Sequence, residues 1–358
     1  MKVCKLVVLS AVIAALAITS FFLVGCTKKQ EPLTPIRVGW QTSWVPQAQL
    51  AMVLKRTNVL QLNGLQGEFK GFTYGGPLAE AALADQIDTL FAADQPAINL
   101  IARGANWKIV SKCIDFRDAL LIPIDSPVSK VADLRGKKIA VPFGSGAHRI
   151  VLELLTEAGL DPAKDVTLVN IDVTEINAMI QGGAVDEAKS LWRGEIAAAA
   201  NWDPNIADFE EKKLVRVLLE KPLFGVMAMS EKFIQANPQA AVNFVMALHE
   251  AVFYYGKHEA EANTWYAQEL NIQLSPQVLS RSATFDQNLK ADSLANVVLS
   301  FTDSEIQILQ NSSDFAFAAG LIKTHPLAKE VVDNILINQA QQRLRSSDKA
   351  TSLVQPVR

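Results

Sequence analysis

Short apolar runs of strand length alternate with segments of helical spacing from residue 36 onward. Such runs, bounded by turn residues, predict buried strands, and apolar residues three and four apart predict one face of a helix. We predict strands at residues 36–40, 69–74, 89–93, 107–113, 139–143, 166–171, 196–200, 214–219 and 224–229, with helices between them at 47–56, 78–85, 97–102, 148–159 and 174–181. Strands separated by helices predict an α/β protein with helices on both faces of its sheets.

The alternation of strands and helices runs twice along the chain, before and after an extended crossing segment at residues 119–124. This predicts a first lobe at residues 36–117 and a second at 118–230, joined by two crossings and separated by a cleft. From residue 231 the spacing becomes helical, and residues 231–337 are predicted to pack as helices on the lobes. Residues 338–358 are polar and largely aperiodic, which predicts a tail without regular structure.

The segment 137–155 has the pattern strand, small-residue turn, helix. Its turn is Gly144-Ser145-Gly146-Ala147, followed by His148, and it falls where the first N–H groups of a helix have no partner. Such a terminus, with a hydroxyl able to cap or donate, attracts a sulfonate, phosphate or carboxylate. The alternative is that these small residues only make a tight turn.

Other polar and aromatic side chains follow the predicted strands, where open α/β sheets bind ligands. Amides of Gln41 and Gln95 suit a polar ligand, although a turn amide also caps its own backbone. Trp44 can line the cleft or belong to the core. Trp202 can pack on the carbon skeleton of a ligand and Asp203 can accept from an ammonium; alternatively, Trp202-Asp203-Pro204 is only the turn at the end of the strand, with Asp203 as a helix cap. His148, in the first helical turn, would reinforce anion binding if it is charged, or would simply be exposed there.

The N-terminus reads as a targeting segment. Lys2 and Lys5 precede an apolar run at residues 7–24, which ends in Leu-Val-Gly before Cys26. A membrane-spanning helix is the alternative, since the run is about long enough. The ending resembles the bacterial lipobox, so we expect a signal peptide at residues 1–25, lipidation of Cys26 and a tether at 26–35.

Composition narrows the classes of function. The chain has 358 residues, 49% of them hydrophobic, and a formal net charge of -3, so nothing in it favours nucleic-acid binding. Three cysteines are too few and too scattered for a disulfide framework or a zinc site. Catalytic motifs are also missing: His249-Glu250 lacks a second histidine at Phe253, and Gly144-x-Gly146 has Arg149 in place of a third glycine. We therefore expect no enzyme and no cofactor.

Taken together, the lipobox, Gln41-Thr42-Ser43, the segment 132–148 and Asn201-Trp202-Asp203-Pro204 resemble substrate-binding lipoproteins of nitrate/sulfonate/taurine-type ABC importers, closest to the taurine/alkanesulfonate branch. The resemblance spans roughly residues 36–337. Two departures are a longer connection at residues 186–193 and a carboxylate and amide at Asp94-Gln95-Pro96.

The resemblance implies a two-lobed periplasmic-binding-protein fold (type II), with two mixed sheets, flanking helices, a hinge and an interlobe cleft. It implies a small anionic or zwitterionic ligand held by Gln41, Trp44, Gln95, Ser145, Gly146, Ala147, His148, Trp202 and Asp203. We expect a monomer outside the cytoplasmic membrane, held there by a lipid anchor, with permease and ATPase subunits as partners. The alternatives are a same-fold binder of an aromatic carboxylate or a pyrimidine, a sensor domain, or a pyrimidine-synthesis enzyme; the last would need a cysteine-rich motif.

Overall fold

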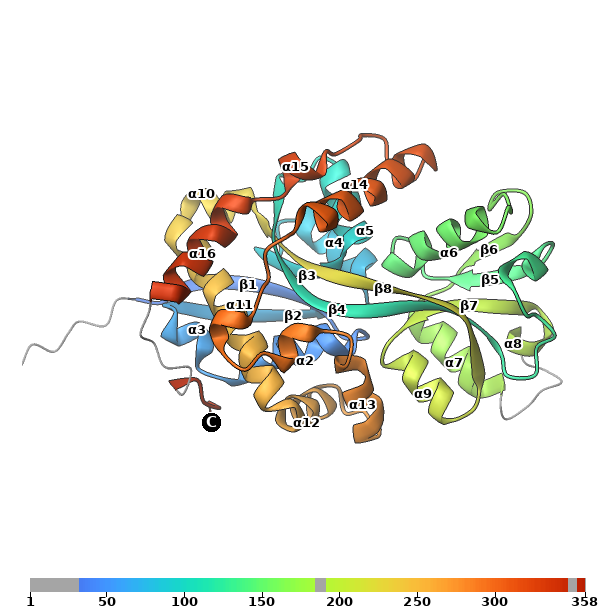
Figure 1. Ribbon diagram of the computed structural model, residues 1–358, viewed down its shortest axis with the longest axis horizontal. Helices are drawn as coiled ribbons and strands as arrows, with labels where there is room; N and C mark the ends of the chain where they lie inside the picture. The colour runs from blue at the N-terminus through green and yellow to red at the C-terminus, as the bar shows by residue number, and fades with distance from the viewer. Residues whose placement is uncertain (1–31, 184–190, 347–352, 358) are drawn as a thin grey trace, which may run out of the picture. The chain divides into compact units, whose positions relative to one another are not determined.

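The computed structural model describes residues 32–183, 191–346 and 353–357 (Figure 1). The predicted signal peptide, Cys26 and most of the predicted tether lie outside these residues, as does most of the connection at 186–193. Residues 33–358 form one compact unit by their contacts. In the part of the chain that is described, no helix is both long and apolar enough to cross a membrane.

Eight strands form one mixed sheet in the order β2-β1-β3-β8-β4-β7-β5-β6. Their bounds are β1 Thr34–Gln41, β2 Leu65–Phe72, β3 Thr89–Ala93, β4 Trp107–Pro123, β5 Lys138–Val141, β6 Thr167–Asn170, β7 Ile196–Trp202 and β8 Val215–Ser230. We call β2, β1 and β3 the first half of the sheet and β7, β5 and β6 the second half. Pairing is parallel within each half, as predicted, and antiparallel wherever β4 or β8 takes part.

The sheet is continuous because β4 and β8 each run through both halves, as Figure 1 shows. This differs from the two separate sheets that we predicted. The predicted lobe boundary at 117/118 falls inside β4, and residues 225–229 of β8 pair with β3 in the first half rather than in the second. Strand β4 continues through the charged residues Asp115, Arg117 and Asp118, because Arg117 is buried against acidic partners.

Between the two halves the sheet narrows to a ribbon of two strands. Residues 115–117 of β4 pair only with residues 222–224 of β8, since β3 stops pairing at Gly225 and β7 starts at Asp118. A bulge between Lys112 and Asp115 precedes the ribbon, and bulges bend and twist a strand pair. This ribbon is where we expect the predicted hinge.

Helices cover both faces of the sheet. Their bounds are α2 Val45–Arg56, α3 Val59–Leu62, α4 Gly75–Leu83, α5 Asp94–Ala102, α6 Gly146–Glu157, α7 Val173–Gly183, α8 Leu191–Gly194, α9 Asn205–Glu211, α10 Glu231–Ala236, α11 Pro238–Lys257, α12 Glu259–Leu270, α13 Pro276–Ala283, α14 Asp303–Ala318, α15 Ala328–Val331 and α16 Asn334–Ser346. Successive residues of β3 show the two faces: Leu90 and Ala92 pack in the core of α4, α5 and α14, and Phe91 and Ala93 pack in the core of α2 and α11.

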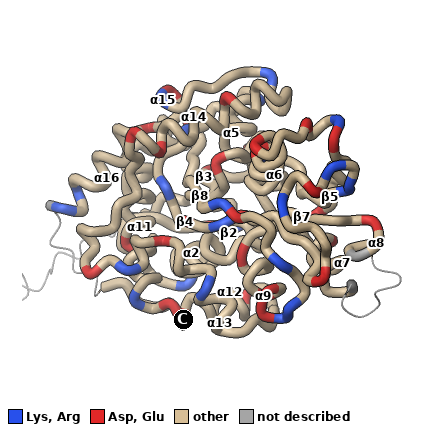
Figure 2. The backbone as a smooth tube through the Cα atoms, turned by 45° about the vertical axis from the view of Figure 1, so that its right-hand side comes forward, with Lys and Arg blue, Asp and Glu red and all other residues tan. Residues whose placement is uncertain are grey.

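The helices after residue 231 pack mainly on the first half, where α11 and α12 contact α2 and α14 contacts α5. The prediction of an unstructured tail from residue 338 is wrong. Helix α16 runs to Ser346 because Ile337 and Ala340 are buried against the core, and Pro356 pairs with Thr57 near the C-terminus. Figure 2 shows that basic and acidic residues are interspersed along the described chain.

Candidate functional site

A small cavity lies between the two halves of the sheet, with walls from both. Its volume is about 20 Å³, roughly the space of one water molecule. On the side of the first half, the wall consists of the turns after β1 and β2 and the start of α5. On the side of the second half, it consists of the turn after β5 and the end of β7. The lining residues are Gln41, Trp44, Gly75, Ala93, Pro96, Phe116, Asp118, Ser145, Gly146 and Trp202. Five of the predicted ligand-binding residues therefore meet here: Gln41, Trp44, Ser145, Gly146 and Trp202.

The amino terminus of α6 opens onto this cavity. Ser145 is its N-cap, with extended backbone, and its Oγ accepts from His148 N at 3.1 Å while donating to Pro142 O at 2.6 Å. The hydroxyl is thus engaged in capping, and the N–H groups of Gly146 and Ala147 precede the first intrahelical bond. A Cβ on Gly146 would lie 2.9 Å from Ala93 Cβ and 3.0 Å from Asp118 Oδ2, so glycine permits this close approach of the two halves.

The two tryptophans have different surroundings. Trp44 is buried against Phe116, with ring centroids 4.5 Å apart, and its indole Nε1 has no hydrogen-bond partner among the described residues. Trp202 Nε1 donates to Ser43 O at 2.8 Å, which connects the end of β7 to the turn after β1. Val45 N donates to Asp203 O at 3.3 Å beside it. These two hydrogen bonds join the halves across the cavity.

The two glutamines are partly engaged by the protein itself. Gln41 Nε2 donates to Phe91 O at 2.9 Å, and its backbone N–H donates to Gln47 Oε1. Gln95 lies outside the cavity wall, where its Nε2 donates to Asn99. Pro96, the next residue, takes the place in the wall that we predicted for Gln95.

Three further predicted residues lie away from the cavity. Ala147 packs in the core. His148 stacks on Phe143 and accepts from Gly144 N at 3.4 Å, and burial lowers its pKa to about 4, so it is neutral near pH 7 and does not supply the charge that we considered. Asp203 faces Arg117, with Nε and Oδ2 2.9 Å apart, because the buried guanidinium needs a carboxylate there.

Asp118 is the polar wall residue that sequence reasoning missed. It is 1% exposed, and its Oδ2 has no hydrogen-bond partner in the part of the chain that is described. Burial raises its pKa well above the ordinary range, Arg149 opposes that shift, and Asp94 and Asp203 add to it. Phe116 and Asp118 reach the same cavity because alternate residues of a strand share a face. The available signal was a charged pair, Arg117-Asp118, inside an apolar strand.

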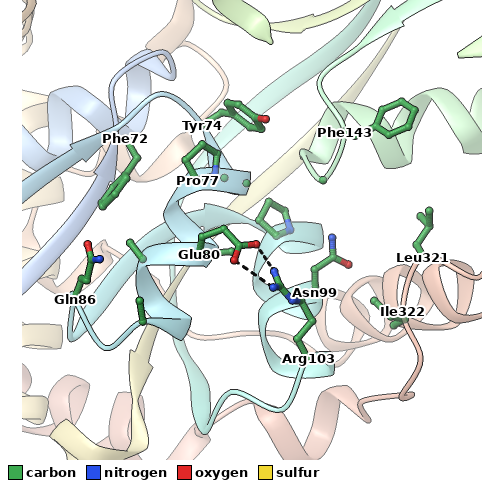
Figure 3. Close-up of a pocket in the computed structure, with 17 residues that line it drawn as sticks. Phe72, Tyr74, Pro77, Glu80, Gln86, Asn99, Arg103, Phe143, Leu321 and Ile322 are labelled. Carbon is green, nitrogen blue, oxygen red and sulfur yellow. Dashed lines mark hydrogen bonds and ion pairs between the residues drawn. The ribbon is translucent and has the colours of Figure 1, made fainter. Parts of the chain in front are cut away.

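A wide groove adjoins the cavity, with Gly75 and Pro96 lining both (Figure 3). Its volume is about 1010 Å³. Tyr74 and Phe143 stand at its upper side in Figure 3, and Arg103 and Glu80 form an ion pair on its floor. The groove is open, and its wall comes mainly from α4, α5 and the turn after β5. Within the described residues no cluster of three or more potential metal ligands occurs.

Residues 102–262 match the family model described as NMT1/THI5 like. The chain is 26% identical over 353 residues to the "Putative aliphatic sulfonates-binding protein" of Bacillus subtilis (strain 168), covering 94% of this chain and 96% of that protein. It is 23% identical to the taurine-binding periplasmic protein of Escherichia coli (strain K12), over 74% of this chain and 76% of that one.

Solved structures share the fold. The alkanesulfonate-binding protein of Xanthomonas axonopodis pv. citri, bound to MOPS, superposes with a TM-score of 0.67 at 21% identity, over 84% of this chain and 99% of that one. A mutant of the desulfurization enzyme DSZB, in complex with biphenyl-2-sulfinic acid, has a TM-score of 0.65 at 16% identity, over 87% of this chain and 99% of that one. The chain therefore has the α/β fold of these proteins. Its sequence is similar to those of sulfonate- and taurine-binding proteins, which confirms the predicted resemblance.

Proposed function

We propose that the chain is the extracytoplasmic solute-binding component of an ABC importer and captures a small organic sulfonate between the two halves of its sheet. One observation carries the proposal: the amino terminus of α6 opens onto a cavity whose opposite walls come from the other half. Helix termini of this kind bind anionic groups through their N–H groups and their dipole. The names of the relatives support the same ligand class.

Capture requires the halves to move. A cavity of about 20 Å³ neither admits nor holds a sulfonate, so the halves separate about the ribbon of residues 115–117 and 222–224 when the ligand enters, and they close around it over a larger space than this structure has. Closing brings Trp202 back to Ser43 and the Asp203 carbonyl back to Val45. A ligand that contacts both halves stabilises the closed state, which the permease and ATPase subunits would recognise.

The sequence supports a location outside the cytoplasmic membrane. The lipobox-like segment before Cys26 favours a lipid anchor on the mature chain, and a monomer is sufficient because one chain provides both walls of the cavity.

A binding role is favoured over an enzymatic one, although an enzyme shares the fold. Cys113, the one cysteine of the described residues, is fully buried and lies outside the cavity wall, and burial raises the pKa of its thiol. A thiol in that state is a poor nucleophile. The cavity wall otherwise offers Ser145, whose hydroxyl is engaged as a cap.

Isothermal calorimetry on the purified full chain in detergent tests the proposal. Taurine, ethanesulfonate, nitrate, benzoate and a neutral aminopyrimidine are titrated separately. The proposal expects saturable heat with at least one sulfonate at one site per chain. Heat with benzoate or the pyrimidine and none with any sulfonate would replace the ligand class by one of the alternatives.

A further inference from the structure

Two buried polar atoms in the wall of the cavity lack partners of their own. Trp44 Nε1 is a donor and Asp118 Oδ2 is an acceptor, and neither has a hydrogen bond to the described protein. Buried polar groups are paired in nearly all proteins, with protein, water or ligand. An unsatisfied donor and an unsatisfied acceptor in one cavity indicate a ligand that both accepts and donates hydrogen bonds.

Within the described residues no ion pair links the Asp118 carboxyl group to a cation, although Arg149 lies close enough to favour its ionised form. Arg149, which acts on it most strongly, is bound to Asp94 and Glu153, and the neighbouring Arg117 is bound to Asp203. A simple sulfonate placed at the start of α6 would bring a second negative charge close to Asp118, because Asp118 Oδ2 lies 3.0 Å from where a Cβ of Gly146 would be. Such a sulfonate would add to the effect of burial, which already raises the pKa of Asp118, whereas an ammonium would favour the ionised carboxylate.

Resting on the proposed function, we infer that Asp118 selects a zwitterionic aminosulfonate, whose sulfonate sits at the Gly146 and Ala147 N–H groups while its ammonium pairs with Asp118. The helix N–H groups and Asp118 Oδ2 both lie next to Gly146. The sulfonate and the ammonium of the ligand must therefore lie close together, as across a two-carbon spacer. Asp118 is thus a specificity-determining residue, in the role that we had predicted for Asp203. A simple alkanesulfonate would leave the carboxylate without a partner.

The test compares taurine with ethanesulfonate, which keeps the sulfonate and the two carbons but lacks the ammonium. The first measurement is calorimetry of the unmodified full chain. Taurine should bind at least about a hundredfold more tightly than ethanesulfonate, because ethanesulfonate leaves one partner of a buried charge pair missing. Asp118→Asn should remove most of this discrimination, by weakening taurine and by relieving the repulsion of ethanesulfonate. Asp208→Asn, a buried carboxylate on α9 outside the cavity, is the matched control and should leave the ratio unchanged.

Equal affinity of the unmodified chain for taurine and ethanesulfonate would overturn the inference, because Asp118 would then be protonated and would donate to the sulfonate. The proposed function would still stand. Unchanged discrimination in a folded Asp118→Asn chain would also overturn it. Binding of neither sulfonate would refute the proposed function and the inference with it.

Discussion

Arg149 Nη2 lies 2.7 Å from Asp94 Oδ2, and both side chains are almost fully buried. Arg149 belongs to α6 in the second half, and Asp94 begins α5 in the first, where Ser312 of α14 also donates to it at 2.6 Å. The pair is therefore a third connection between the halves, beside the hydrogen bonds of Trp202 and Val45.

Removing one partner of this pair should destabilise the protein strongly. Asp94→Asn leaves the Arg149 guanidinium with one carboxylate fewer in a buried site, and we expect a loss of about 3–5 kcal/mol in the free energy of unfolding. Urea unfolding measures it. Glu195→Gln breaks the exposed pair with Lys138 and should cost far less, because solvent screens an exposed pair. Similar losses for the two variants would contradict a structural role for the buried pair.

A side chain at Gly146 should weaken binding with little effect on the rest of the fold. Gly146→Val places methyl groups where a Cβ already meets Ala93 at 2.9 Å, so the halves cannot close over the start of α6. We expect the affinity for a bound sulfonate to fall more than about tenfold, since overpacking costs about 1–3 kcal/mol. Gly182→Val in α7, where a Cβ has open space, is the control for adding the same side chain to a helix. Full affinity in folded Gly146→Val protein would place the ligand elsewhere.

The Trp202 indole should contribute to closing through one hydrogen bond. Trp202→Phe removes the donor to Ser43 O and should weaken binding by roughly two- to tenfold, in line with about 0.5–1.5 kcal/mol for a hydrogen bond. Trp265→Phe, on α12 away from the cavity, should leave affinity unchanged. Equal effects of the two substitutions would show that aromatic bulk matters here and the hydrogen bond does not.

Two buried histidines should make stability fall on acidification. Burial lowers the pKa of His148 and His249 from 6.5 to about 4. Between pH 6.5 and pH 4 the unfolded chain binds more protons, so the free energy of unfolding decreases as pH falls, by up to about 1.4 kcal/mol per unit for each histidine.

Urea unfolding across this window, with His148→Gln against the exposed control His325→Gln, isolates one contribution. The His148 variant should show a smaller slope of stability against pH than the unmodified chain, and the His325 variant should match the unmodified chain more closely. An unchanged slope in His148→Gln would contradict the lowered pKa.

Apolar patterning predicted the strands and helices well, because the burial pattern of each strand and each amphipathic helix depends on residues that are close together in the sequence. The apolar residues of α6, Ile150, Val151, Leu154 and Leu155, lie in the core as their spacing predicts. The start of α6 was likewise predicted as a capped turn, and Ser145 is its cap.

Pairings between distant residues could not be predicted in this way. The continuity of β4 depends on Arg117 meeting Asp203, Glu210 and Glu220, which lie far along the chain. For the same reason Asp203 was predicted to face a ligand and Asp118 was overlooked. The helical C-terminal segment was missed because α16 has few apolar residues and is held by tertiary packing on α11.

Movement of the two halves on binding tests the central claim most directly. Spin labels on cysteines replacing the exposed Glu68 of β2 and Lys164 before β6, in a full chain whose native Cys4, Cys26 and Cys113 are replaced by serine, report the separation of the halves by pulsed electron resonance. Saturating taurine should shorten and narrow the distance distribution, and Gly146→Val should prevent this change. The same distribution with and without taurine, under conditions where calorimetry shows binding, would contradict capture between the halves.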